Sequence, residues 1–134
     1  MTSDTSPTAQ FIGVGLHVQH LPRSVDFYTR VLGMHEIARY ALDTFDEVVV
    51  GYPTGPDAAT ILLVQEREHL GPYTIGDAMD RVVVRVGDVH GICASVADQG
   101  GTVEREPVEV RKHGVTMAMI TDPDGYRLEL IQPG

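Results

Sequence analysis

Residues 121–132 read TDPDGYRLELIQ, a tight turn followed by an alternating strand. In the turn, the proline presets φ at an early position, the glycine tolerates a positive φ, and the two aspartates can accept hydrogen bonds from freed backbone amides. After the turn, Leu128 and Leu130 fall on one face of the strand and Glu129 on the other. The stretch therefore predicts a β-hairpin that carries a carboxylate in mid-strand, on the side away from two leucines.

Composition limits the classes of function that this chain can serve. Its 134 residues suit one domain, and 43% of them are hydrophobic. The net charge is −9 and no basic cluster occurs, which argues against binding to nucleic acid or to an anionic membrane. The single cysteine, Cys93, excludes an internal disulfide framework and fits a reducing compartment.

The ends and connections of the chain contain no targeting or membrane-spanning pattern. Residues 1–10 read as a flexible tail without the basic and apolar regions of a signal peptide. No apolar run approaches the ~20 residues that a membrane helix needs. We therefore expect a cytoplasmic protein with a single folded domain over residues 11–134.

The hydrophobic pattern after the tail predicts a strand, a helix and three more strands, and then repeats this order. The first set is expected at residues 11–18, at a helix from an N-cap at Ser24 to Leu32, and at 36–42, 47–52 and 60–65, with turns at 43–46 and 53–57. The second set is expected at 81–86, a helix at 89–99, and 102–108, 115–121 and 126–132.

The repeat has a countable offset. Val18 and Val86 lie 68 positions apart, as do Tyr28 and Val96. The economical interpretation is an α+β protein of two βαβββ modules, at about 11–66 and 80–132, joined by a polar linker at 67–79.

Four stretches of the sequence, in this order, resemble the vicinal oxygen chelate superfamily, which includes glyoxalases, bleomycin-resistance proteins and extradiol dioxygenases. They are SVDFYTRVLGM at 24–34, YTIGDA at 73–78, KHGVT at 112–116 and DPDGYRLEL at 122–130. Within that superfamily the chain is most similar to glyoxalase I, a metal-dependent lyase of glutathione hemithioacetals. The resemblance implies two βαβββ modules whose strands form a half-barrel around a cavity.

The resemblance also implies four metal-ligand positions, one on the first and one on the last strand of each module. They fall on Gly13, Leu62, Arg81 and Glu129, where His or Gln, Glu, His and Glu are usual. Glycine and leucine offer no donor, and a guanidinium stays protonated and repels a cation. We therefore expect no metal cofactor, unless a divalent metal has unconventional ligands, and we expect Arg81 to pair with Glu129 through both carboxylate oxygens.

The chain has six histidines, of which one is a candidate for chemistry. His17 lies four residues after Gly13 on the same strand face, so we expect it to point into the cavity as a hydrogen-bonding or acid/base group. Glu129 is the second candidate catalytic residue. The others are expected to be exposed, namely His20, His35, His69, His90 and His113.

Two hypotheses about function remain open from the sequence. In the first, a metal-free cavity binds a small, largely apolar or aromatic molecule. In the second, the chain is a lyase, isomerase or dioxygenase of the same superfamily that uses metal-free acid/base chemistry or unconventional ligands. The expected pocket consists of Gly13, His17, Leu62, Arg81, Arg85 and Glu129. Because one short chain leaves strand edges and apolar faces uncovered, we expect a homodimer in which Gly13 and Leu62 face the partner's Arg81 and Glu129.

Overall fold

The structure of the chain is a computed structural model that describes residues 8–53 and 58–134. The expected tail at 1–10 and the expected turn at 53–57 lie largely outside the described residues. Elsewhere the order of strand, helix and three strands occurs twice, which confirms the α+β class and the repeat.

The bounds of the elements follow the expected pattern to within a few residues. The first module contains β1 (Gly13–His17), α1 (Leu21–Asp26), its π-helical continuation η1 (Phe27–Val31), β2 (His35–Ala41), β3 (Phe45–Gly51) and β4 (Thr60–Glu66). The second contains β5 (Val82–Arg85), α2 (Val89–Ser95), the 3₁₀ turns η2 (Ala97–Gln99) and η3 (Arg111–His113), β6 (Thr102–Val110), β7 (Val115–Thr121) and β8 (Arg127–Pro133).

Helix α1 begins three residues before the predicted N-cap, Ser24, so that prediction was wrong. The cap is His20, whose Nδ1 accepts a hydrogen bond from the backbone N–H of Arg23 at 3.3 Å. Pro22 fits the first turn because its missing N–H has no helical partner there. Ser24 is buried, and its hydroxyl donates to Asp124 of the second module at 3.2 Å. A tertiary contact thus uses the hydroxyl that the sequence pattern assigned to capping.

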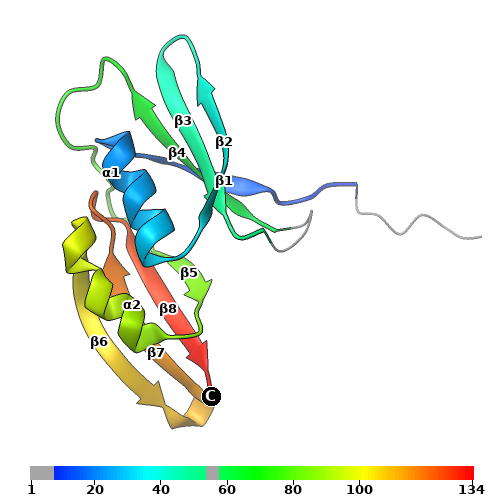
Figure 1. The fold of residues 1–134 in the computed structure, drawn as a ribbon, viewed down its shortest axis with the longest axis vertical. Helices are drawn as coiled ribbons and strands as arrows, with labels where there is room; N and C mark the ends of the chain where they lie inside the picture. The colour runs from blue at the N-terminus through cyan, green and yellow to red at the C-terminus, as the bar shows by residue number, and fades with distance from the viewer. Residues whose placement is uncertain (1–7, 54–57) are drawn as a thin grey trace, which may run out of the picture.

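Each module forms a four-stranded sheet with the same topology. The strand orders are β1-β4-β3-β2 and β5-β8-β7-β6. The first and last strands of each module are parallel neighbours, and the other neighbours are antiparallel. Figure 1 shows the two sheets one above the other along the long axis of the molecule. As a result β1, which begins at Gly13, and β5, which directly follows Arg81, are both edge strands.

One face of each sheet is packed against a helix, and we call the opposite face its open face. Leu128 and Leu130 are fully buried in the core, as the alternation predicts. Glu129 lies on the open face, where the strand register places it between Met119 and Val83. Among the described residues, no helix is long and apolar enough to span a membrane.

The turn at residues 122–125, in the second module, contacts the first module and joins the two. Asp122 is 2% exposed and accepts hydrogen bonds from the backbone N–H groups of Asp124 and Tyr126, both at 2.9 Å. Its other oxygen accepts from the hydroxyl of Tyr28, in the first module, at 2.8 Å. Burial raises the pKa of the Asp122 carboxyl to about 6, although these donors oppose the shift.

Further contacts reinforce this junction. Asp124 accepts from the backbone N–H of Gln19 at 2.8 Å, and the hydroxyl of Tyr126 donates to the carbonyl of His17 at 2.8 Å. Phe27 approaches Gly101 so closely that a β-carbon there would lie 2.6 Å from its ring. The relative position of the two sheets is therefore set by contacts on the helix side of the molecule.

Candidate functional site

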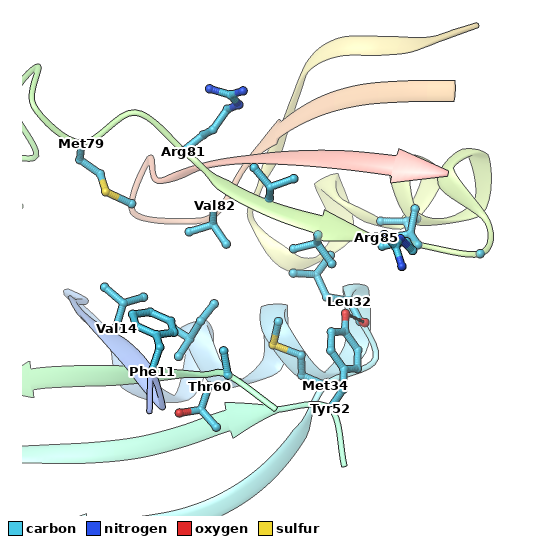
Figure 2. A pocket seen from close by; sticks show the side chains of 17 residues that line it. Phe11, Val14, Leu32, Met34, Tyr52, Thr60, Met79, Arg81, Val82 and Arg85 are labelled. Atoms are coloured by element: carbon cyan, nitrogen blue, oxygen red, sulfur yellow. Dashed lines mark hydrogen bonds between the residues drawn. The ribbon is translucent and has the colours of Figure 1, made fainter. Parts of the chain in front are cut away.

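A cleft of about 890 Å³ lies between the two modules, and we call it the inter-module cleft (Figure 2). Its walls are mostly aliphatic and aromatic, with one threonine and two arginines. The residues that line it are Phe11, Val14, Leu32, Met34, Tyr52, Ala59, Thr60, Ile61, Met79, Arg81, Val82, Val83, Val84, Arg85, Val86, Gly87 and Ile92.

The inter-module cleft runs along the edge strands of the two sheets. All four residues of β5 line it, and Val14 contributes from β1. Within the described chain, β5 pairs with β8 alone and β1 with β4 alone, so one edge of each strand is unpaired. Side chains from both faces of β5 can therefore reach the space between the modules.

Tyr52 is a polar group positioned in the wall of the inter-module cleft. Its hydroxyl donates a hydrogen bond to the backbone carbonyl of Leu32 at 2.6 Å. Burial raises the pKa of this phenol above its usual range, so it stays protonated near neutral pH. The hydrogen bond occupies the only proton that the hydroxyl can donate.

We call the four positions at which the resemblance implies metal ligands the former ligand positions. The two in the first module, Gly13 and Leu62, pack against each other. A β-carbon built on Gly13 would lie 2.8 Å from the Cδ1 atom of Leu62 and 2.5 Å from the Oγ1 atom of Thr60. No side chain fits at Gly13 unless these neighbours move. The leucine thus occupies space that a ligand from β1 would need.

The two former ligand positions of the second module form an ion pair, as expected. Arg81 Nε lies 3.4 Å from Glu129 Oε2, with the carboxylate side chain 13% exposed and the guanidinium 35% exposed. The expected two-pronged contact was wrong, because a different nitrogen of Arg81 donates to the neighbouring Asp80. The guanidinium is shared between two carboxylates, one of which is at the surface.

A single chain does not gather the four former ligand positions at one point. Gly13 and Leu62 belong to the first sheet, and Glu129 belongs to the second, with Arg81 immediately before β5. In Figure 2, Arg81 extends away from the first module, toward the side opposite Val14. The two pairs therefore belong to separate open faces.

The residues at these positions do not fit a divalent cation of the kind that the resemblance implies. They supply one carboxylate, and that carboxylate faces a guanidinium. Across residues 8–53 and 58–134, no three His, Cys, Asp or Glu side chains are grouped so that they could hold an ion. The described residues therefore provide no second group of side chains that could bind the ion in place of the usual ligands.

His17 is half-exposed and has a carboxylate partner that the sequence analysis missed. Its Nε2 lies 2.9 Å from Glu66 Oε1, and its ring stacks on Tyr73 at a centroid distance of 4.9 Å. Tyr73 in turn stacks on His69 at 3.7 Å. A carboxylate that orients an imidazole is an arrangement suited to proton transfer.

A signal for Glu66 was present in the repeat, whereas none pointed to Tyr73. The first and last strands of a module are parallel neighbours, and His17 pairs with Val64. The residue two positions further along β4 lies on the same face, and it is Glu66. Tyr73 reaches His17 from the linker, whose path the pattern does not predict.

The predicted pocket overlaps the inter-module cleft in two of its six residues. Arg81 and Arg85 line the cleft. The other four do not, namely Gly13, His17, Leu62 and Glu129. Their roles as pocket or catalytic residues therefore stay predictions. The other five histidines are exposed, as expected.

Comparisons with known proteins agree with the fold and the repeat. The Glyoxalase/Bleomycin resistance protein/Dioxygenase superfamily matches residues 10–130. A lactoylglutathione lyase of Neisseria meningitidis serogroup A is 39% identical over 120 residues, which are 87% of this chain and 86% of that protein. A probable lactoylglutathione lyase of Synechocystis is 35% identical over 87% of this chain and 90% of that protein.

Solved structures show the same architecture. Glyoxalase I from Zea mays superposes with a TM-score of 0.80 at 24% identity, over 92% of this chain and 47% of that one, so the present chain spans about half of the maize protein. The trypanothione-dependent glyoxalase I of Leishmania major superposes with a TM-score of 0.77 at 26% identity, over 93% of this chain and 87% of that one. By sequence and by fold, the chain belongs to the glyoxalase/bleomycin resistance protein/dioxygenase superfamily.

Proposed function

We propose that this chain binds a small, largely apolar molecule in the inter-module cleft and that it does so without a metal ion. The observation that carries the proposal is the cleft itself, about 890 Å³ in volume and lined mainly by aliphatic and aromatic side chains. Ligand sites of small molecules commonly have this size and an apolar lining with a few polar groups. A molecule that fills the cleft would bury the unpaired edge of β5 and remove apolar surface from water.

The residues at the former ligand positions support the metal-free part of the proposal. Gly13 and Leu62 are packed against each other, and Glu129 is paired with Arg81. A divalent cation would have to displace a guanidinium and would gain a single carboxylate. Binding by apolar contact requires none of these changes.

The test uses a neutral apolar fluorophore, N-phenyl-1-naphthylamine, titrated into the full-length protein. We expect saturable binding that Val14→Trp weakens at least about tenfold, because an indole there would fill part of the cleft. Val108→Trp is the matched control, since Val108 is exposed and does not line the cleft. Equal affinity of both variants and the wild type would refute the proposed site.

A second candidate is a lyase or isomerase, and the similarity at 39% identity to proteins named lactoylglutathione lyase favours it. His17, oriented by Glu66, would supply the proton-transfer group, with Glu129 as a second candidate. Turnover in a lactoylglutathione lyase assay, abolished by His17→Asn and independent of added Zn²⁺ or Ni²⁺, would favour this alternative. Absence of turnover with and without these ions would exclude it.

We also propose that the chain forms a homodimer. Both open faces lack a covering helix in the described chain, and Phe11 and Ile12 beside β1 are 71% and 67% exposed. A second copy could bring the Arg81 and Glu129 face of one subunit opposite the Gly13 and Leu62 face of the other. Such an interface would cover the open faces of the two sheets, which one chain leaves exposed.

A further inference from the structure

The inter-module cleft contains two guanidinium groups with different surroundings. Arg81 pairs with Asp80 and Glu129 and is turned away from the first module (Figure 2). Arg85 makes no hydrogen bond or ion pair with any described residue, although it lines the same cleft. One of the two positive charges is thus already compensated, and the other is not.

The lining around Arg85 supplies no counter-charge. The described residues that line the inter-module cleft include no aspartate or glutamate. In Figure 2, Arg85 lies at the end of the cleft where Leu32 and Tyr52 are found. The Tyr52 hydroxyl donates its one proton to the Leu32 carbonyl, so it has no proton left to donate to an anion bound at Arg85.

The free guanidinium of Arg85 belongs to a protein whose net charge is −9. The protein has 19 acidic and 10 basic side chains, so carboxylates are available to pair with most cations. At physiological ionic strength, charges more than about 8 Å away are largely screened, so the local guanidinium outweighs the distant excess of negative charge. The cleft therefore attracts an anion although the protein as a whole is acidic.

We propose that the ligand of the inter-module cleft is an apolar carboxylic acid whose carboxylate binds Arg85. The proposal rests on the proposed function and names the chemical class of its ligand. A planar guanidinium can donate two parallel hydrogen bonds to one carboxylate, which fixes the polar end of the molecule. The apolar body then extends along β5 between Val14 and Val82, toward the end of the cleft near Met79 (Figure 2).

The experiment compares decanoic acid with 1-decanol by calorimetric titration into the wild-type protein at neutral pH and an ionic strength of ~0.15 M. The two molecules have the same apolar chain and differ in the ionised group. We expect the acid to bind about tenfold more tightly than the alcohol, in line with one charge-assisted contact at a partly exposed site. Added salt is expected to weaken the binding of the acid and to leave the binding of the alcohol nearly unchanged.

Arg85→Gln tests the anchor, and Arg105→Gln is its matched control. Arg105 is also exposed and unpaired among the described residues, but it does not line the inter-module cleft. We expect Arg85→Gln to remove the preference for the acid and to change the affinity for the alcohol less than about twofold. Urea unfolding of both variants establishes that they are folded.

The outcomes separate this inference from the proposed function. The inference is overturned if the acid and the alcohol bind equally well, or if Arg105→Gln lowers the affinity for the acid as much as Arg85→Gln does. Either result leaves the proposed binding of apolar molecules in the cleft unaffected. If inorganic phosphate displaces the acid as effectively as a second apolar acid does, the site is a general anion site and the inference is also wrong. If neither molecule binds and the Val14→Trp variant behaves like the wild type with the neutral fluorophore, the proposed function fails as well.

Discussion

The hydroxyl of Tyr28 donates a hydrogen bond to the carboxylate of Asp122 across 94 positions of sequence, at 2.8 Å and fully shielded from water. Tyr28 belongs to the first module and Asp122 to the turn of the second. The hydrogen bond thus joins the two modules, and because both side chains are buried, water cannot replace either partner. Its removal would leave a buried carboxylate with one donor fewer.

Tyr28→Phe should lower the free energy of unfolding by about 1–3 kcal/mol, the range for losing a buried hydrogen bond to a charged group. The measurement is urea unfolding at neutral pH. Tyr40→Phe is the control, because Tyr40 is 49% exposed and its hydroxyl makes no hydrogen bond with a described residue. A loss for Tyr28→Phe no larger than for Tyr40→Phe would show that the contact contributes little.

Stability should depend on pH through Asp122. Its pKa in the folded protein is about 6, against 3.8 for an unperturbed aspartate, so the folded state binds the proton more tightly than the unfolded state. Ionisation of Asp122 therefore costs stability above pH 6, and this cost, on the order of 1–3 kcal/mol, is relieved as the pH falls from 6 toward 4.

Asp122→Asn isolates this effect, since the amide cannot ionise and its oxygen can still accept from the two backbone donors. We expect the free energy of unfolding of the wild type, relative to this variant, to increase as the pH is lowered from 7 to 4. The comparison cancels the other carboxylates, including Glu36, whose pKa is lowered by its hydrogen bond from Arg39. A difference that does not change with pH would mean that Asp122 does not titrate in this range.

The Arg81–Glu129 pair should contribute little to stability on its own. Arg81 is 35% exposed, and Asp80 shares its guanidinium. A double-mutant cycle with Arg81→Gln and Glu129→Gln is expected to give a coupling energy of about 0.5–1.5 kcal/mol. The surface pair Arg127–Glu104, at 2.9 Å, provides a reference cycle. A coupling of several kcal/mol would point to a fully desolvated pair.

Metal analysis should show no stoichiometric transition metal in the purified protein. We expect well below one equivalent of Zn, Ni, Fe or Mn per chain by elemental analysis, because the former ligand positions provide one carboxylate and a competing guanidinium. A stoichiometric metal that is lost in Glu129→Gln would contradict this expectation and would favour a metal-dependent enzyme.

Sedimentation should give twice the chain mass of 14.6 kDa at micromolar concentration. Ile12→Asp is expected to shift the protein toward the monomer, since a carboxylate would replace an exposed apolar side chain beside β1. Ile37→Asp, on the outer edge strand β2 of the same sheet, is the control. A wild-type monomer would refute the dimer.

The two-module fold follows from the sequence pattern, and the sequence also predicts that the usual metal ligands are missing. The turn at Asp122 and the alternation around Glu129 are local, since backbone geometry and a two-residue period depend on neighbouring residues alone. The repeat makes Gly13 equivalent to Arg81 and Leu62 equivalent to Glu129, and the resemblance to the superfamily implies that these four are the ligand positions. Even so, the helix start was misplaced, because Ser24 is used by a contact with Asp124 from the other module.

The position of the inter-module cleft and the pairing of its charges depend on tertiary contacts. The inter-module cleft is built from residues between Phe11 and Ile92, and the hydrogen bond from Tyr28 to Asp122 joins the two modules that form its walls. Whether Arg81 or Arg85 keeps an unpaired guanidinium depends on which carboxylates lie close to it. Strand alternation places both arginines on the same face and so does not distinguish them. Long-range packing settles such choices, because burial and partner distance are properties of the assembled chain and not of any short segment.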